Sequence, residues 1–170
     1  MELRPNGRFG EFVIGNGGVM SRKTVVITAV LSIFIATIAM AADKPGTRNE
    51  AIALVNKAAS MLKDAGAEKL ISTVNAGEQG FRDRDLYLFV IGPDQKVVAH
   101  AYDQGRIGLV ASELYDGDGQ PYGKLILKLA DDKGQWVQYR IHNPVTGKVA
   151  PKSTFVRRVG DYILGCGVYE

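Results

Sequence analysis

The sequence contains one cysteine, Cys166, so the chain has no internal disulfide and a domain of this length must be held together by its core. Cys166 lies between two glycines, and a cysteine in such a run is typical of a small buried residue rather than a nucleophile. The two histidines, His100 and His142, are accompanied by no zinc signature, phosphate-binding loop or nucleophile elbow. We therefore expect no enzyme activity, no metal site and no cofactor.

A surplus of charge is also lacking in the part of the chain that we expect to be mature. The formal net charge is +3, but four basic and two acidic residues precede position 42, and the remainder carries 17 Lys and Arg against 16 Asp and Glu. Nucleic-acid-binding domains show a basic patch or stripe. We therefore expect no nucleic-acid partner. A content of 46% hydrophobic and 23% charged residues is ordinary for a globular protein.

The N-terminal part has the pattern of a targeting segment. A short basic start at residues 20–23 is followed by an uncharged apolar run at 24–38 and by the small residues Ala39-Met40-Ala41. This order is typical of a secretory signal peptide. We predict an upstream extension at 1–19, a signal peptide at 20–41 and one mature periplasmic domain at 42–170. The alternative is an uncleaved anchor in the inner membrane, because residues 25–42 are 18 residues long, at the short edge of what spans a bilayer.

The mature chain is predicted to begin with a long amphipathic helix, capped by Asn49 and extending to about Asn75. Its apolar residues recur at spacings of three and four, and Gly66 is expected to interrupt it. Core packing is the ordinary role of such a stripe. The alternative is a homodimer formed through this helix.

Five strands are predicted after the helix. Residues 85–91 are apolar nearly throughout, which indicates a central strand, and residues 96–102 return beside it as a hairpin. The runs 135–141, 153–159 and 162–169 read as an antiparallel meander.

A shorter helix is predicted at 122–132, before the meander, with Leu125, Ile126 and Leu129 facing inward. Asp116 and Asp118 lie in a glycine-rich turn that lacks the other ligands of an EF-hand calcium loop. The order of elements predicts an α+β fold, in which the long N-terminal helix packs on a five- to six-stranded antiparallel sheet.

Six stretches in this order resemble a known family. They are Asp85–Val90, Val98–His100 with Ile107-Gly108, Gly134–Arg140, Asn143–Lys148, Pro151–Val156 and Gly165–Tyr169. Over residues 49–170 the chain resembles a single Cache domain of the second type. The resemblance implies a PAS-like extracytoplasmic sensor domain that binds a small molecule, often a short organic acid such as acetate, propionate, pyruvate or lactate.

Cache domains are usually the input modules of larger signalling proteins, so the resemblance implies a membrane receptor or sensor kinase as a possible partner. This sequence ends one residue after the last of the six stretches. We therefore expect a stand-alone exported version of the domain. The alternative is an exported structural or protein-interaction domain with no small ligand.

A pocket for a small carboxylate needs a cation and a few neutral donors within apolar walls. Lys152 is the first candidate for the cation, in a position where the family repeats a lysine, and its alternative is a solvated charge at the start of a strand. Arg140 is the second candidate. The other candidate ligand-binding residues are Tyr87, His100, Tyr102, Trp136 and Tyr139. Trp136 and Arg140 share one face of their predicted strand and Tyr139 lies on the other, and the sequence leaves open which face lines the pocket.

Overall fold

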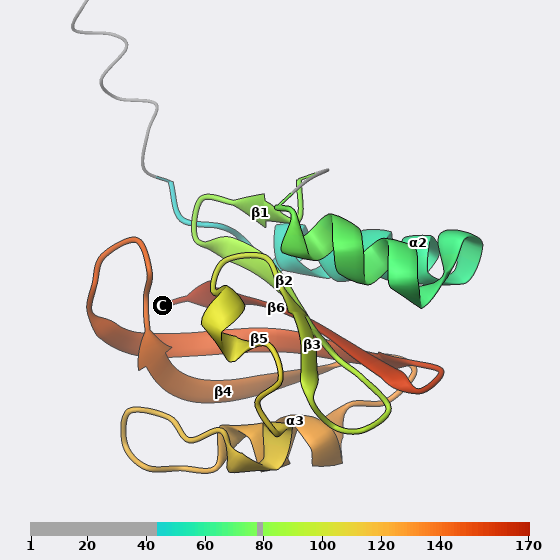
Figure 1. Ribbon diagram of the computed structural model, residues 1–170. Coiled ribbons are helices and arrows are strands. Elements are labelled where there is room, and N and C mark those ends of the chain that lie inside the picture. Colours follow the sequence, from blue (N-terminus) through green and yellow to red (C-terminus); the bar gives the residue numbers. More distant parts are fainter. Residues whose placement is uncertain (1–43, 78–79) are drawn as a thin grey trace, which may run out of the picture. The chain divides into compact units, whose positions relative to one another are not determined.

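The computed structural model describes residues 44–77 and 80–170, which form an antiparallel sheet with one helix packed on each of its faces (Figure 1). The elements in chain order are α2 (Arg48–Asn75), β1 (Arg82–Asp83), β2 (Leu86–Ile91), β3 (Val97–His100), the short 3₁₀ turns Gln104–Arg106 and Ala111–Glu113, α3 (Tyr122–Leu129), β4 (Gln135–His142), β5 (Val149–Val159) and β6 (Tyr162–Tyr169). The predicted α+β fold is confirmed.

The extension predicted at 1–19 and the signal peptide predicted at 20–41 lie outside the described residues. Among the described residues no helix combines the length and apolarity needed to cross a bilayer.

The long helix α2 begins two residues earlier than predicted, because Thr47 and not Asn49 is its cap. The Thr47 hydroxyl accepts a hydrogen bond from the Glu50 backbone N–H, and the Glu50 carboxylate accepts one from the Thr47 N–H at 2.7 Å. This reciprocal pair satisfies two backbone donors at the start of the helix. The predicted interruption at Gly66 is confirmed, since this residue has a φ of +83° within the helix.

The six strands are all antiparallel to their neighbours, in the order β1-β2-β6-β5-β4, with β3 pairing β2. Every residue of β2 is buried, as predicted for a central strand. Strand β5 begins at Val149 rather than at Ser153, so Pro151 and Lys152 lie inside the strand. This strand therefore begins four residues earlier than predicted.

The strand register decides which side chains share a face of the sheet. Lys152 pairs with Tyr169 on one side and with Tyr139 on the other, and directly paired residues point to the same face. This face packs against α3. The opposite face, which carries Trp136 and Cys166, packs against α2.

Helix α3 is shorter than predicted and turned relative to the expected orientation. Ile126 is buried as expected, but Leu125 and Leu129 are 40% and 41% exposed. The inward stripe consists of Tyr122, Ile126 and Ala130, which are spaced by four residues. The expectation for Leu125 and Leu129 is therefore wrong, because the tyrosine at the start of the helix and not the leucines covers the sheet.

Candidate functional site

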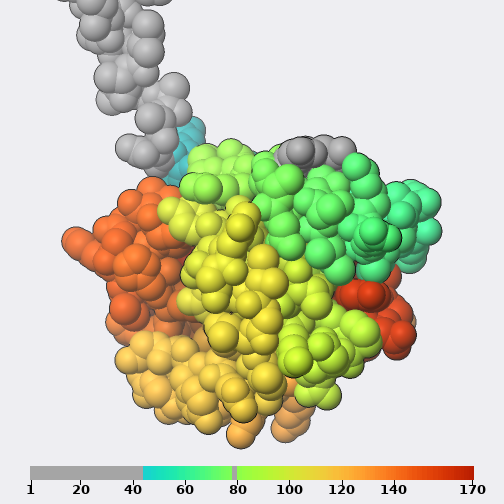
Figure 2. Space-filling view, in the orientation of Figure 1, coloured from blue at the N-terminus to red at the C-terminus, as the bar shows by residue number. Residues whose placement is uncertain are grey.

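The main pocket lies at one end of the sheet and has a volume of about 250 Å³. It is lined by residues from the ends of β2 and β3, the following 3₁₀ turn and the β4–β5 connection, namely Tyr87, His100, Tyr102, Asp103, Arg106, His142 and Pro144. In Figure 2 the segments around residue 105 (yellow) and residue 145 (orange) lie side by side on this part of the surface. Two connections that are far apart in the sequence thus meet over one edge of the sheet.

Three aromatic rings form the wall of the main pocket. The ring centroid of Tyr87 is 5.0 Å from that of His100 and 5.7 Å from that of Tyr102. The Tyr102 hydroxyl donates a hydrogen bond to the Pro144 carbonyl at 3.2 Å. This bond ties the end of the β2–β3 hairpin to the β4–β5 connection and holds the ring in place.

His100 is a neutral hydrogen-bond donor in this wall. Burial, together with the positive charges of Arg106 and Lys152, lowers the pKa of His100 to about 4. Its Nδ1 atom accepts from the backbone N–H groups of Tyr102 at 3.3 Å and Asp103 at 2.8 Å. The ring hydrogen is therefore on Nε2, and no group of the described residues accepts it.

Arg106 is the cation of the main pocket, and the sequence analysis did not identify it. Its Nη1 donates to the Tyr122 hydroxyl of α3 at 2.9 Å, and its Nε lies 3.3 Å from Oδ2 of Asp103. Among the described residues no acceptor pairs with Nη2, and the side chain is 29% exposed. The signal that could have found it is the cluster of polar residues from His100 to Arg106 directly after a buried strand.

Lys152 lies behind the wall and not in the main pocket. It is 2% exposed, so the alternative of a solvated strand-end charge is wrong. Its stem crosses Gly167, where a Cβ atom would lie 2.5 Å from the lysine Cε. Its ammonium nitrogen is 3.7 Å from the ring centroid of Tyr87 and 4.5 Å from that of Tyr169. Burial lowers the pKa of Lys152 to about 7.

A chain of hydroxyls connects Lys152 to the rim of the main pocket. Tyr169 donates its hydroxyl hydrogen to the His142 carbonyl at 3.0 Å, so its oxygen is the acceptor for the Tyr87 hydroxyl at 2.9 Å. The Lys152 ammonium also donates to this oxygen, at 3.5 Å. The Lys152 ammonium therefore acts on the pocket through the Tyr87 ring and hydroxyl and does not contact a ligand directly.

The remaining candidate residues do not line the main pocket. Trp136 packs on Phe155 beneath α2, with the Arg48 guanidinium 4.7 Å from the centre of its ring. Arg140 is exposed and forms an ion pair with Asp118 at 3.4 Å.

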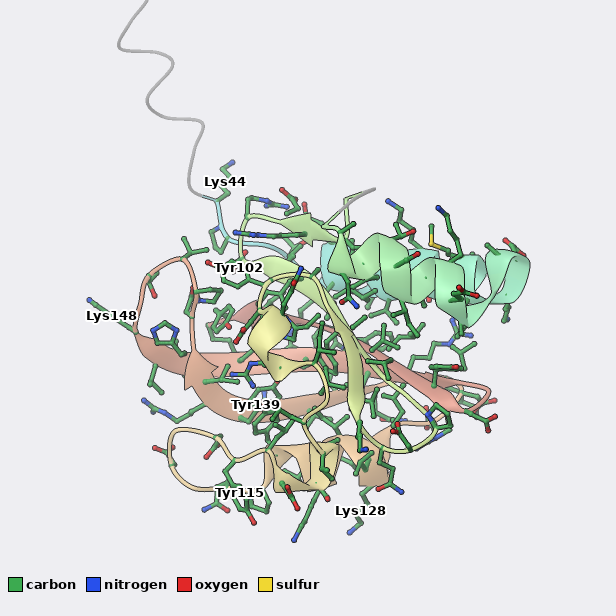
Figure 3. All side chains as sticks on the ribbon, viewed as in Figure 1. Lys44, Tyr102, Tyr115, Lys128, Tyr139 and Lys148 are labelled. Carbon is green, nitrogen blue, oxygen red and sulfur yellow. The ribbon has the colours of Figure 1, made fainter. Side chains whose placement is uncertain are left out.

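Tyr139 shares the face of Lys152, but its ring is stacked on Tyr122 at 4.3 Å and its oxygen accepts from Thr154 at 2.8 Å. Figure 3 shows Tyr139 between the sheet and α3. Tyr139 and Arg140 instead border a second hollow of about 280 Å³, together with Gln138, Pro151, Lys152, Ser153 and Glu170.

The comparison with protein families decides the classification of this fold. The model of the family described as single Cache domain 2 matches residues 19–170. The chain belongs to this family. Cache domains are sensor domains and not a family of enzymes, and the resemblance seen in the sequence is confirmed.

Solved structures with a similar fold include a chemotaxis protein and the sensor domain of a chemotaxis protein. A methyl-accepting chemotaxis protein from Vibrio parahaemolyticus RIMD 2210633 is 17% identical, with a TM-score of 0.57 over 85% of this chain and 96% of that chain. A periplasmic sensor domain of a chemotaxis protein is 16% identical, with a TM-score of 0.54 over 88% of this chain and 99% of that one.

A third structure is described as showing carboxylic acid recognition by a Cache chemosensory domain. It is 14% identical, with a TM-score of 0.50 over 88% of this chain and 99% of that chain. No curated protein sequence matches this chain significantly. At these identities the structural likeness establishes the fold of the chain.

Proposed function

We propose that this protein is a periplasmic sensor domain that binds a small carboxylate-bearing molecule in the main pocket. The observation that carries the proposal is the convergence of Arg106 and the Nε2–H of neutral His100 on a pocket walled by the rings of Tyr87 and Tyr102. Ligand pockets of this kind combine mostly apolar walls with a few placed donors. The third structural neighbour, described by carboxylic acid recognition, belongs to the same fold.

The donors suit a carboxylate because one of them is a guanidinium. The Arg106 Nη2 group has no protein acceptor among the described residues and can donate to a ligand oxygen, while Nη1 is oriented by its bond to Tyr122. Charge-assisted bonds from arginine to a carboxylate are among the strongest in proteins. Acetate, propionate, pyruvate and lactate are the simplest members of the proposed ligand class.

The alternative function, an exported interaction domain without a ligand, predicted a filled cavity and exposed cations. The main pocket is unfilled, with a volume of about 250 Å³, and Lys152 is buried; both observations support ligand binding. Arg140 is exposed, as the alternative function predicted. The proposal includes a membrane receptor or sensor kinase that reads the bound state. A homodimer through α2 stays a prediction.

A thermal-shift measurement tests the proposal. Acetate, propionate, pyruvate or lactate should raise the unfolding midpoint of the purified protein in proportion to the logarithm of its concentration above Kd. Arg106→Gln should abolish the shift. Arg140→Gln is the matched control, because it removes a guanidinium that lies outside the main pocket, and it should keep the shift. A midpoint that no carboxylate raises, or a shift that survives in Arg106→Gln, would contradict the proposal.

A further inference from the structure

The main pocket presents an acidic side chain beside its cation, which a simple organic acid does not require. Asp103 lines the pocket, and its Oδ2 atom lies 3.3 Å from Nε of Arg106. Its other oxygen, Oδ1, accepts from the Gly105 N–H at 3.0 Å. A carboxylate oxygen accepts more than one hydrogen bond, and this side chain is 51% exposed, so Asp103 can accept from a ligand as well.

Charges of both signs surround the main pocket. The Arg82 guanidinium lies 4.0 Å from the centroid of the Tyr102 ring in its wall. Arg106 contributes a positive charge to the pocket and Lys152 one behind the Tyr87 ring. Asp103 contributes a negative charge to the pocket, and the negative charge of the buried Asp85 acts on Lys152. A ligand with only a negative charge meets attraction and repulsion together, whereas a ligand with both charges can match the pair in the wall.

We propose that the ligand of the main pocket is an α-amino acid, bound by its carboxylate to Arg106 and by its ammonium to Asp103. This inference rests on the proposed carboxylate site and names the class of ligand for it. In an α-amino acid both charged groups are attached to the α-carbon, and Asp103 and Arg106 are likewise neighbours in space. The long contact between these two side chains is then replaced by two shorter charge-assisted hydrogen bonds to the ligand. The ligand side chain lies against the rings of Tyr87 and Tyr102.

A series of three acids with the same carbon chain isolates the contribution of the ligand ammonium to binding. L-alanine, lactate and propionate differ in bearing an ammonium, a hydroxyl or a hydrogen on the α-carbon. L-leucine, its α-hydroxy analogue and isocaproate form a second series with a larger side chain. In calorimetric titration of the full-length protein, the amino acid of at least one series should bind about tenfold more tightly than the unsubstituted acid, with the hydroxy acid between them.

Asp103→Asn tests the acidic side chain without removing the turn. Asparagine keeps an oxygen that can accept from the Gly105 N–H, but it carries no charge. The variant should lose the preference for the amino acid and bind the unsubstituted acid as well as, or better than, the wild type does. Asp118→Asn is the control, since it removes the carboxylate that pairs with Arg140 outside the main pocket, and it should leave the preference unchanged.

The outcomes distinguish this inference from the proposed function. If the unsubstituted acids bind through Arg106 at least as tightly as the amino acids, the carboxylate site stands and the inference is wrong. A preference for the amino acid that persists in Asp103→Asn also overturns the inference. If neither series binds, the carboxylate site itself is refuted.

Discussion

Replacing Lys152 with methionine should change the way in which the stability of the protein depends on pH. Lys152 is 2% exposed, and burial lowers its pKa from the ordinary 10.5 to about 7. Between these two values the unfolded chain binds a proton that the folded chain has lost. The free energy of unfolding of the wild type therefore rises with pH across this window through Lys152.

The size of the effect follows from the width of the window. One pKa unit corresponds to about 1.4 kcal/mol, so burial of the ammonium costs up to about 5 kcal/mol below pH 7. Methionine is similar in length, has no charge and can follow the same path over Gly167. Lys152→Met should accordingly be more stable than the wild type in acid, and this advantage should shrink by about 1.4 kcal/mol for each pH unit above 7.

Urea unfolding of both proteins at matched pH, from about pH 6 to about pH 10, measures this difference, and the contributions of the other titrating groups cancel between the two proteins. A difference in unfolding free energy that does not vary with pH would refute the reasoning. It would mean that the ammonium in the folded protein is not destabilised by burial.

Two further predictions concern the packing and the acid sensitivity of the same face of the sheet. Gly165→Ala should destabilise the fold by about 1–3 kcal/mol, because a Cβ atom at this position would overlap the Phe89 ring; an unchanged urea midpoint would contradict that packing. Because the pKa of His100 is lowered to about 4, the free energy of unfolding of the wild type should fall by up to about 3 kcal/mol as the pH falls from about 6.5 to about 4. Over that range the unfolded chain binds a proton that the folded chain does not. His100→Gln should remove this loss, and an equally steep loss in the variant would assign the acid sensitivity to other groups.

The elements of the fold were predictable from the sequence because their signals are local. The run of apolar residues from Leu86 to Ile91 is long enough to identify a buried strand, and it is buried throughout. The three- and four-residue spacing in the long helix identified α2, and Gly66 marked its interruption correctly. The orientation of α3 was missed because the expected inward face, with Leu125 and Leu129, and the observed one, with Tyr122, are both apolar. The stacking of Tyr122 on Tyr139 of the sheet decides which face is buried.

The candidate site was predictable only in part, because its geometry depends on contacts between distant segments. Lys152 was expected at the start of a strand, with a solvated charge as the alternative, whereas the space that buries its stem is provided by Gly167 on the neighbouring strand. Arg106 lies in a connection without any periodicity, and its place in the pocket wall depends on Tyr122 from α3. Both contacts join residues that are far apart in the sequence, so the local pattern around either residue does not predict its partner.

The most direct test of the central claim is a crystal structure of the protein grown with L-alanine, together with one grown with propionate. The account predicts carboxylate oxygens within about 3 Å of the Arg106 guanidinium, beside the Tyr87 and Tyr102 rings, in at least one of the two crystals. Occupation of the second hollow beside Arg140 in place of the main pocket would contradict the account. So would a ligand whose carboxylate points away from Arg106.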